Sequence, residues 1–135
     1  MDLNDCIKKG LVKKTNVNTN LISSLVEMSK IKQNAVKSAK IDKENISAYV
    51  SLAYDSLREV LEALCVLKGY KIISHICIGE FLKKFFPNFK HAEFDRYRWI
   101  RNSINYYGEK IEFNQGKELI KKIFNLKKDV LNILK

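Results

Sequence analysis

The sequence KENISAYVSLAYDSLREVLEALCVLKG (residues 43–69) carries an apolar stripe at helical spacing. Its apolar side chains recur every three or four residues, so they lie on one face of a helix. We expect the Asp42 carboxylate to cap the start of this helix and Gly69 to end it in the left-handed conformation. The stripe consists of Ile46, Val50, Ala53, Leu57, Val60, Leu61, Leu64 and Leu67. The sequence therefore predicts a long amphipathic helix over residues 43–68.

Three other segments show the same helical periodicity. Residues 21–39, 91–110 and 119–134 each place apolar side chains on one side, and the asparagine-rich run at 16–20 offers N-caps for the first of them. Strand-like alternation is nearly absent, and we interpret the short β-branched cluster at residues 71–78 as a loop and the start of a helix. The predicted class is all-α.

Two shorter helices are also expected. Ser74 is a candidate cap for a helix that ends at Pro87, because proline cannot continue a helix. A weaker pattern over residues 2–9 indicates a short opening helix. Short connections between consecutive helices favour antiparallel neighbours, so we expect an up-and-down antiparallel bundle of four to five long helices.

The length and composition of the chain fit one folded unit. A chain of 135 residues with 46% hydrophobic content can bury one core. We expect a single domain over residues 1–135, with a short N-terminal helix or arm at 1–16 and the core bundle at 17–135. A formal net charge of +10 makes the surface attractive to polyanions such as RNA, DNA or an anionic membrane, which by itself does not assign a function.

The three cysteines, Cys6, Cys65 and Cys77, are odd in number and lack C-x-x-C spacing. This pattern argues against a disulfide framework or a zinc site, so we expect reduced thiols. No apolar run approaches the ~20 residues of a membrane span, and the first 14 residues lack the apolar centre of a secretory signal. We therefore expect a cytoplasmic protein without membrane contact.

The sequence RYRWIRNSINYYG (residues 96–108) is the densest polar and aromatic cluster of the chain. A guanidinium matches phosphate oxygens, an amide can donate and accept, and a tyrosine ring can stack on an unpaired base. Such a helix could therefore cradle the phosphates and bases of RNA. Two neighbouring ridges carry the polar residues, with Arg98, Asn102 and Tyr106 on one and Arg101 and Asn105 on the other.

An alternative interpretation assigns these arginines no ligand. Ion pairs at helical spacing are common on helix surfaces, and the aromatic residues would then only pack. The arginines Arg96, Arg98 and Arg101 would be solvated or paired with Glu93, Asp95 and Glu109.

The segment RNSINY (residues 101–106) resembles the R-N-x-x-x-H form of the motif that characterises the HEPN superfamily. Members of that superfamily are helical bundles, often dimeric, and many are metal-independent endoribonucleases, some of them toxins. The upstream segment YDSLREVLEAL (54–64) resembles an earlier HEPN helix with its acidic position, and GYKIISH (69–75) is similar to the loop that follows in prokaryotic members. The resemblance covers the chain from about residue 42 onward.

This resemblance implies a site at a groove where the motif helices of two subunits meet and bind RNA or a nucleotide. It also implies that Asp55 or Glu62 orients Arg101, although both carboxylates could instead belong to an internal ion-pair set with Arg58. The catalytic candidates are Arg101, Asn102 and Tyr106, and the phosphate-binding candidates are Arg98, Arg101, Asn105 and Tyr107.

One departure from the motif concerns the proton acceptor. Active members of the superfamily have histidine where this chain has Tyr106. A phenol is a far weaker proton acceptor than an imidazole at neutral pH. His75 and His91 are interpreted as structural or surface residues. We therefore expect impaired catalysis, and no cofactor or metal.

A second hypothesis is a non-catalytic interaction module. HEPN proteins often accompany a minimal nucleotidyltransferase as its toxin or partner, and in some pairs a tyrosine near the motif receives AMP. Tyr106 and Tyr107 invite that comparison. A third hypothesis is an unrelated helical adaptor protein.

The last predicted helix also carries a series of lysines. They could guide a nucleic-acid backbone or simply form a solvated helix face. These lysines are Lys117, Lys121, Lys122, Lys127 and Lys128.

Overall fold

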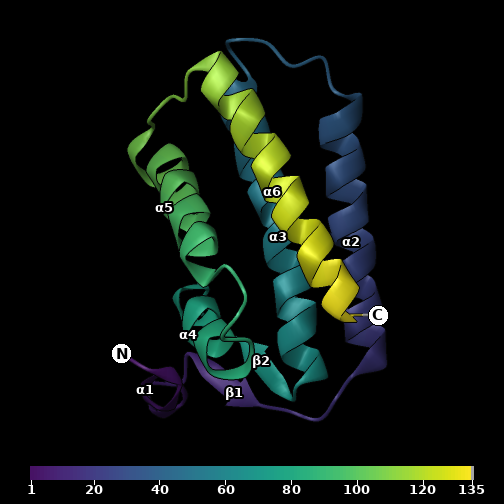
Figure 1. The fold of residues 1–135 in the computed structure, drawn as a ribbon, viewed down its shortest axis with the longest axis vertical. Coiled ribbons are helices and arrows are strands. Elements are labelled where there is room, and N and C mark those ends of the chain that lie inside the picture. The colour runs from purple at the N-terminus through teal and green to yellow at the C-terminus, as the bar shows by residue number, and fades with distance from the viewer. Residues whose placement is uncertain (135) are drawn as a thin grey trace.

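Four long helices dominate the structure, a computed structural model that describes residues 1–134 (Figure 1). Two shorter helices and a pair of three-residue strands complete the described part of the chain. The predicted all-α class is confirmed in so far as most of the described residues are helical. In chain order the elements are α1 (Leu3–Lys8), β1 (Val12–Lys14), α2 (Thr19–Ser38), α3 (Ile46–Leu67), β2 (Tyr70–Ile72), α4 (Ile76–Phe85), α5 (His91–Tyr107) and α6 (Phe113–Leu134).

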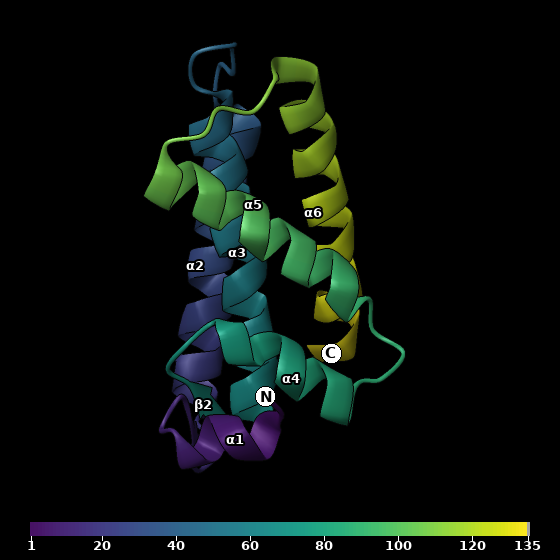
Figure 2. The same ribbon diagram turned by 90° about the vertical axis from the view of Figure 1, so that its left-hand side faces the viewer.

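Helix α3 is the central element, and every other helix except α1 packs against it. Its apolar stripe is buried except for Leu67, and Leu57, Leu61 and Leu64 are fully enclosed. The long helices α2 and α5 run in one direction and α3 and α6 in the other (Figure 1). Helix α5 crosses the others obliquely (Figure 2). None of the helices within residues 1–134 has an apolar stretch that could cross a membrane.

The strands form an antiparallel pair at one end of the molecule, next to α1 and α4 (Figure 1). Val12 lies opposite Ile72 and Lys14 lies opposite Tyr70. The interpretation of residues 71–78 as loop and helix start is therefore wrong for its first two residues. Val12 is buried and the Tyr70 ring packs against Phe81, so apolar side chains hold this short pair against the bundle.

A disulfide bond joins Cys6 of α1 to Cys77 of α4. The expectation that the cysteines are reduced is thus wrong for this pair. The two residues are 71 positions apart in the sequence, and only the packing of α1 against α4 brings them together. The third cysteine, Cys65, is free and buried in α3.

Three helix starts differ clearly from the predicted ones, and α6 begins at Phe113, six residues before the periodic segment 119–134. Helix α3 begins at Ile46, three residues later than expected, because the Asp42 side chain accepts hydrogen bonds from the amides of Glu44 and Asn45 in a preceding turn. Helix α4 begins after His75, and Ser74 is not its N-cap.

Other helix ends lie at or near the predicted positions. The side chain of Asn18, within the asparagine-rich run, caps α2 by accepting from the Leu21 amide. Helix α5 stops at Gly108, whose φ of 66° is left-handed, rather than continuing to residue 110. Gly69 likewise has a positive φ of 86° just beyond α3, as expected for a glycine stop.

Candidate functional site

The seam between α3 and α5 is built around an aromatic stack. The rings of Tyr54 on α3 and Phe94 on α5 are stacked with their centroids 5.8 Å apart, and both side chains are buried. Further along the seam, Ser51 Oγ donates a hydrogen bond of 3.2 Å to Asn105 Oδ1. These contacts fix α5 against α3 and set the positions of the arginines between them.

Arg101 projects from α5 toward α3. Its Nη2 atom lies 3.6 Å from Asp55 Oδ1, and its Nη1 atom donates a hydrogen bond of 3.4 Å to Asn102 Oδ1. The guanidinium carbon lies 5.8 Å from the centroid of the Tyr54 ring. The Arg101 side chain is 17% exposed, so it is held at the seam and still reaches solvent.

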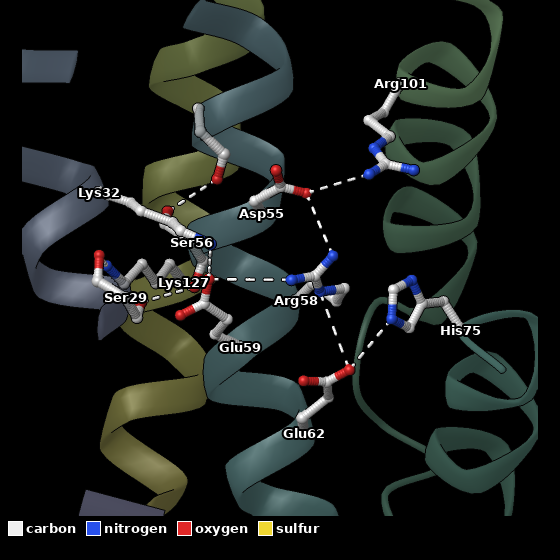
Figure 3. A network of polar contacts seen from close by, with 11 residues as sticks. Ser29, Lys32, Asp55, Ser56, Arg58, Glu59, Glu62, His75, Arg101 and Lys127 are labelled. Carbon is white, nitrogen blue, oxygen red and sulfur yellow. Dashed lines mark hydrogen bonds and ion pairs between the residues drawn. The ribbon is translucent and has the colours of Figure 1, made fainter. Parts of the chain in front are cut away.

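Arg58 continues this network along α3 (Figure 3). Its Nη1 atom lies 3.3 Å from Asp55 Oδ1, so one carboxylate oxygen lies between Arg58 and Arg101. Glu59 and Glu62 each have an oxygen 3.8 Å from the Arg58 guanidinium. Of the two carboxylates expected to orient Arg101, the structure places Asp55 against it.

Glu62 has other partners. One of its oxygens lies 3.2 Å from His75 Nε2, at the start of α4. Figure 3 shows that Glu62 and His75 sit at the end of the network away from Arg101. Glu62 is thus part of the ion-pair set with Arg58, the alternative considered for it from the sequence.

The remaining predicted site residues are spread around α5. Arg98 Nε lies 3.9 Å from Asp95 Oδ1, one of the ion pairs considered from the sequence, and Asn105 contacts α3 through Ser51. Tyr106 and Tyr107 are 71% and 79% exposed at the end of the helix. The structure does not bring these two tyrosines into the Arg101 network within one chain.

Tyr54 belongs to this site and was not identified from the sequence. Its side chain is 1% exposed, and burial raises the pKa of its hydroxyl well above the ordinary value while Arg58, Arg98 and Arg101 act to lower it. The sequence could have indicated Tyr54, because it lies four residues before Arg58, one helical turn away on the same face of α3.

A second polar network lies inside the bundle, among α2, α3 and α6. Lys127 Nζ donates to the Ser29 carbonyl oxygen at 3.2 Å and to Gln33 Oε1 at 2.5 Å. Lys32 pairs with Glu59 nearby. Burial lowers the pKa of Lys127 to about 8, although Glu59 opposes this effect. Lys127 is 3% exposed, so the expectation that it belongs to a solvated or nucleic-acid-guiding lysine face is wrong.

A groove of about 620 Å³ separates α5 from α6 on the other side of α5. Trp99, Arg96 and Ser103 of α5 line one wall, and Glu118 and Lys122 of α6 line the other. Trp99 is 65% exposed. Arg101 does not line this groove, so the groove and the Arg101–Asp55 network lie on different faces of α5.

The fold and the site together define a helical protein with a partly buried arginine–carboxylate network at the contact of two helices. Within residues 1–134, no group of three or more histidine, cysteine or acidic side chains is placed to hold a metal ion. The chain matches no known protein family, no characterised protein and no solved structure with which it was compared.

Proposed function

We propose that this chain is an HEPN-like protein that binds RNA or a nucleotide through Arg101. The observation that carries the proposal is the Asp55–Arg101 contact of 3.6 Å, which holds a 17% exposed guanidinium at the α3–α5 seam. Asn102 and Asn105 on the same helix supply amide groups beside it. The net charge of +10 favours association with a polyanion.

The arrangement suits phosphate binding because the arginine is oriented before a ligand arrives. A guanidinium offers five donors in a planar fork, and the contacts of Arg101 with Asp55 and Asn102 involve its Nη atoms. Fixing such a long side chain in advance lowers the entropy lost on binding. Asp55 thus acts as a positioning residue for Arg101.

Catalysis is expected to be impaired. Tyr106 replaces the histidine of the superfamily motif and is 71% exposed at the end of α5. A phenol in such a position is a poor acceptor for the 2′-hydroxyl proton of RNA at neutral pH. We therefore propose RNA or nucleotide binding as the main activity, with any toxin-like, metal-independent endoribonuclease activity weak.

We further propose that two chains pair through α5. Tyr106 and Tyr107 at the end of this helix are 71% and 79% exposed, and aromatic residues are enriched at protein interfaces. A homodimer through this end of α5 would bring two copies of Arg101, which lies five residues before Tyr106, close to each other. Light scattering over a concentration series tests the pairing, and a strictly monomeric protein would argue against it.

The RNA-binding proposal is tested with a fluorescently labelled single-stranded oligouridine at low salt. We expect Arg101→Ala to weaken binding at least tenfold and Arg101→Lys to recover only part of the affinity, because lysine keeps the charge but loses the fork. Arg96→Ala is the matched control, since Arg96 lies on the same helix but lines the α5–α6 groove. Equal losses in Arg101→Ala and Arg96→Ala would contradict a specific role for Arg101.

A second candidate function is that of a partner for a minimal nucleotidyltransferase. The high exposure of Tyr106 and Tyr107 favours it, because an acceptor hydroxyl must enter the active site of the transferase. Incubation with such an enzyme and ATP should add the mass of one AMP moiety, and Tyr106→Phe or Tyr107→Phe should abolish the addition. Unchanged mass in the wild-type chain would exclude this function.

A further inference from the structure

Six buried side-chain polar atoms lack a hydrogen-bond partner within residues 1–134, and four of them belong to one cluster at the α3–α5 seam. These four are the hydroxyl of Tyr54 and the Nε atoms of Arg58, Arg98 and Arg101. Burying hydrogen-bonding atoms without a partner is unfavourable, so each such atom requires an explanation. The Nε atoms of Arg58 and Arg98 lie 3.8 and 3.9 Å from carboxylate oxygens, which is too far for a hydrogen bond, so all four groups can still donate to a ligand.

Helical spacing explains why these residues gather. Tyr54 and Arg58 are four residues apart on α3, and Arg98 and Arg101 are three apart on α5. The Tyr54–Phe94 stack presses the two helices together at this point. The Arg101 guanidinium lies 5.8 Å from the centroid of the Tyr54 ring, and Arg98 follows Phe94 by one helical turn on α5.

The free donors of the cluster, rather than its net charge, favour an anion. Asp55 is shared by Arg58 and Arg101, and Asp95 lies beside Arg98. Glu62 lies 3.8 Å from Arg58 Nε, so the three guanidinium groups have at least three carboxylates near them. Each guanidinium nevertheless keeps an Nε donor without a hydrogen-bond acceptor among the described residues.

We propose that Tyr54, Arg58, Arg98 and Arg101 form a binding site for a phosphate monoester, the group found at a phosphorylated RNA end and in a mononucleotide. This inference rests on the proposed RNA or nucleotide binding and specifies which part of the ligand is recognised. Asp55 lies between Arg58 and Arg101 and competes with the ligand charge while it positions both side chains.

A monoester suits this cluster better than an internal phosphodiester. A terminal phosphate has three free oxygens and carries nearly two negative charges at neutral pH, whereas a diester has two free oxygens and one charge. The three arginine side chains are only 16%, 23% and 17% exposed, in chain order, which favours entry of a chain end over passage of a continuous backbone. The hydroxyl of Tyr54 remains protonated, because burial raises its pKa, and can donate to a phosphate oxygen.

The test compares two short oligouridines that differ only in a 5′-phosphate or a 5′-hydroxyl, with AMP and inorganic phosphate as competitors. We expect the 5′-phosphate to tighten binding by tenfold or more. Tyr54→Phe, which keeps the stacked ring, and Arg98→Lys should each remove most of that difference. Asp55→Asn should tighten binding of the phosphorylated oligomer severalfold, and Arg96→Lys is the control. Circular dichroism and thermal unfolding establish that each variant is folded.

The possible outcomes separate this inference from the proposed function. Equal binding of both oligomers in an Arg101-dependent manner would overturn the monoester site and leave RNA binding intact. AMP binding that depends on Tyr54 and Arg98, without binding of either oligomer, would support the site with a mononucleotide as its ligand. No binding of any of the four probes would overturn both proposals.

Discussion

The Asp55 carboxylate lies between two arginines from different helices, with one oxygen 3.6 Å from Arg101 Nη2 and 3.3 Å from Arg58 Nη1. A single acidic side chain of α3 thereby links the positive charges of α3 and α5. The Asp55 side chain is 21% exposed, so solvent screens these contacts only in part.

Asp55→Ala should lower the free energy of unfolding by about 1–2 kcal/mol, because it leaves two partly buried arginines without their shared acceptor. Urea denaturation followed by circular dichroism measures the change. Asp129→Ala, at an exposed position on α6, is the matched control. A loss no larger than that of the control would show that the network does not stabilise the seam.

Reduction of the Cys6–Cys77 disulfide should destabilise the protein, since the bond links α1 to α4 across 71 residues of sequence. Cross-links over loops of this length contribute about 2–4 kcal/mol. The melting temperature of the wild type should fall when a phosphine reductant is added. Cys77→Ser should melt at the lower temperature with or without the reductant. A wild type that is insensitive to reduction would contradict the linkage.

The buried side chain of Lys127 should make the free energy of unfolding depend on pH. Burial lowers its pKa to about 8 in the folded chain, below its ordinary value of 10.5. Below about pH 8 the side chain is charged in both states, and the cost of burying that charge is fully present. Between about pH 8 and 10.5 the folded chain releases the proton first, so the free energy of unfolding gains up to about 3 kcal/mol from this residue.

The pH dependence is measured against Lys127→Met, which keeps a long unbranched side chain. We expect the difference in unfolding free energy between wild type and variant to change in favour of the wild type as the pH rises from 7.5 to about 10. Other lysines titrate equally in both proteins, so the comparison isolates Lys127. Parallel stability curves would mean that Lys127 is more hydrated than its 3% exposure indicates.

Gly116 permits the close approach of α6 to α3. A β-carbon at this position would collide with the side chain of Ile46, so Gly116→Ala should cost about 1–3 kcal/mol through overpacking. The double variant Gly116→Ala with Ile46→Ala should lose less stability than the sum of the two single variants, because alanine removes the Ile46 Cγ1 atom that the new β-carbon would meet. Chemical denaturation of the wild type, both single variants and the double variant gives the coupling energy. Strict additivity would show that the two side chains do not compete for space.

The helical part of the fold follows from periodicity alone. Apolar spacing placed α2 within two residues of its ends, and Gly69 and Gly108 stop their helices as left-handed glycines. Local hydrogen bonding caused the error at the start of α3, because the Asp42 side chain accepts from the amides of Glu44 and Asn45 in a turn that precedes the helix. The strand pair was missed because three residues carry too little periodicity, and β1 and β2 lie far apart in the sequence.

The candidate site was only partly predictable. The motif around Arg101 identified the helix, and a resemblance pointed to Asp55, but the convergence of Tyr54, Arg58 and Arg98 depends on the packing of α5 against α3. The burial of Lys127, in contrast, could have been predicted from the sequence. Lys127 lies four residues after Ile123 and three before Val130, both buried, so its position on the apolar stripe of α6 was a readable signal of burial.

The groove between α5 and α6 has a practical consequence for observing the protein at work. Trp99 is the one tryptophan of the chain, and it lines this groove on the same helix that carries Arg98 and Arg101. Any tilt of α5 would alter the solvent around a single indole ring. The intrinsic fluorescence of the unlabelled protein therefore reports on the orientation of the helix that carries the site.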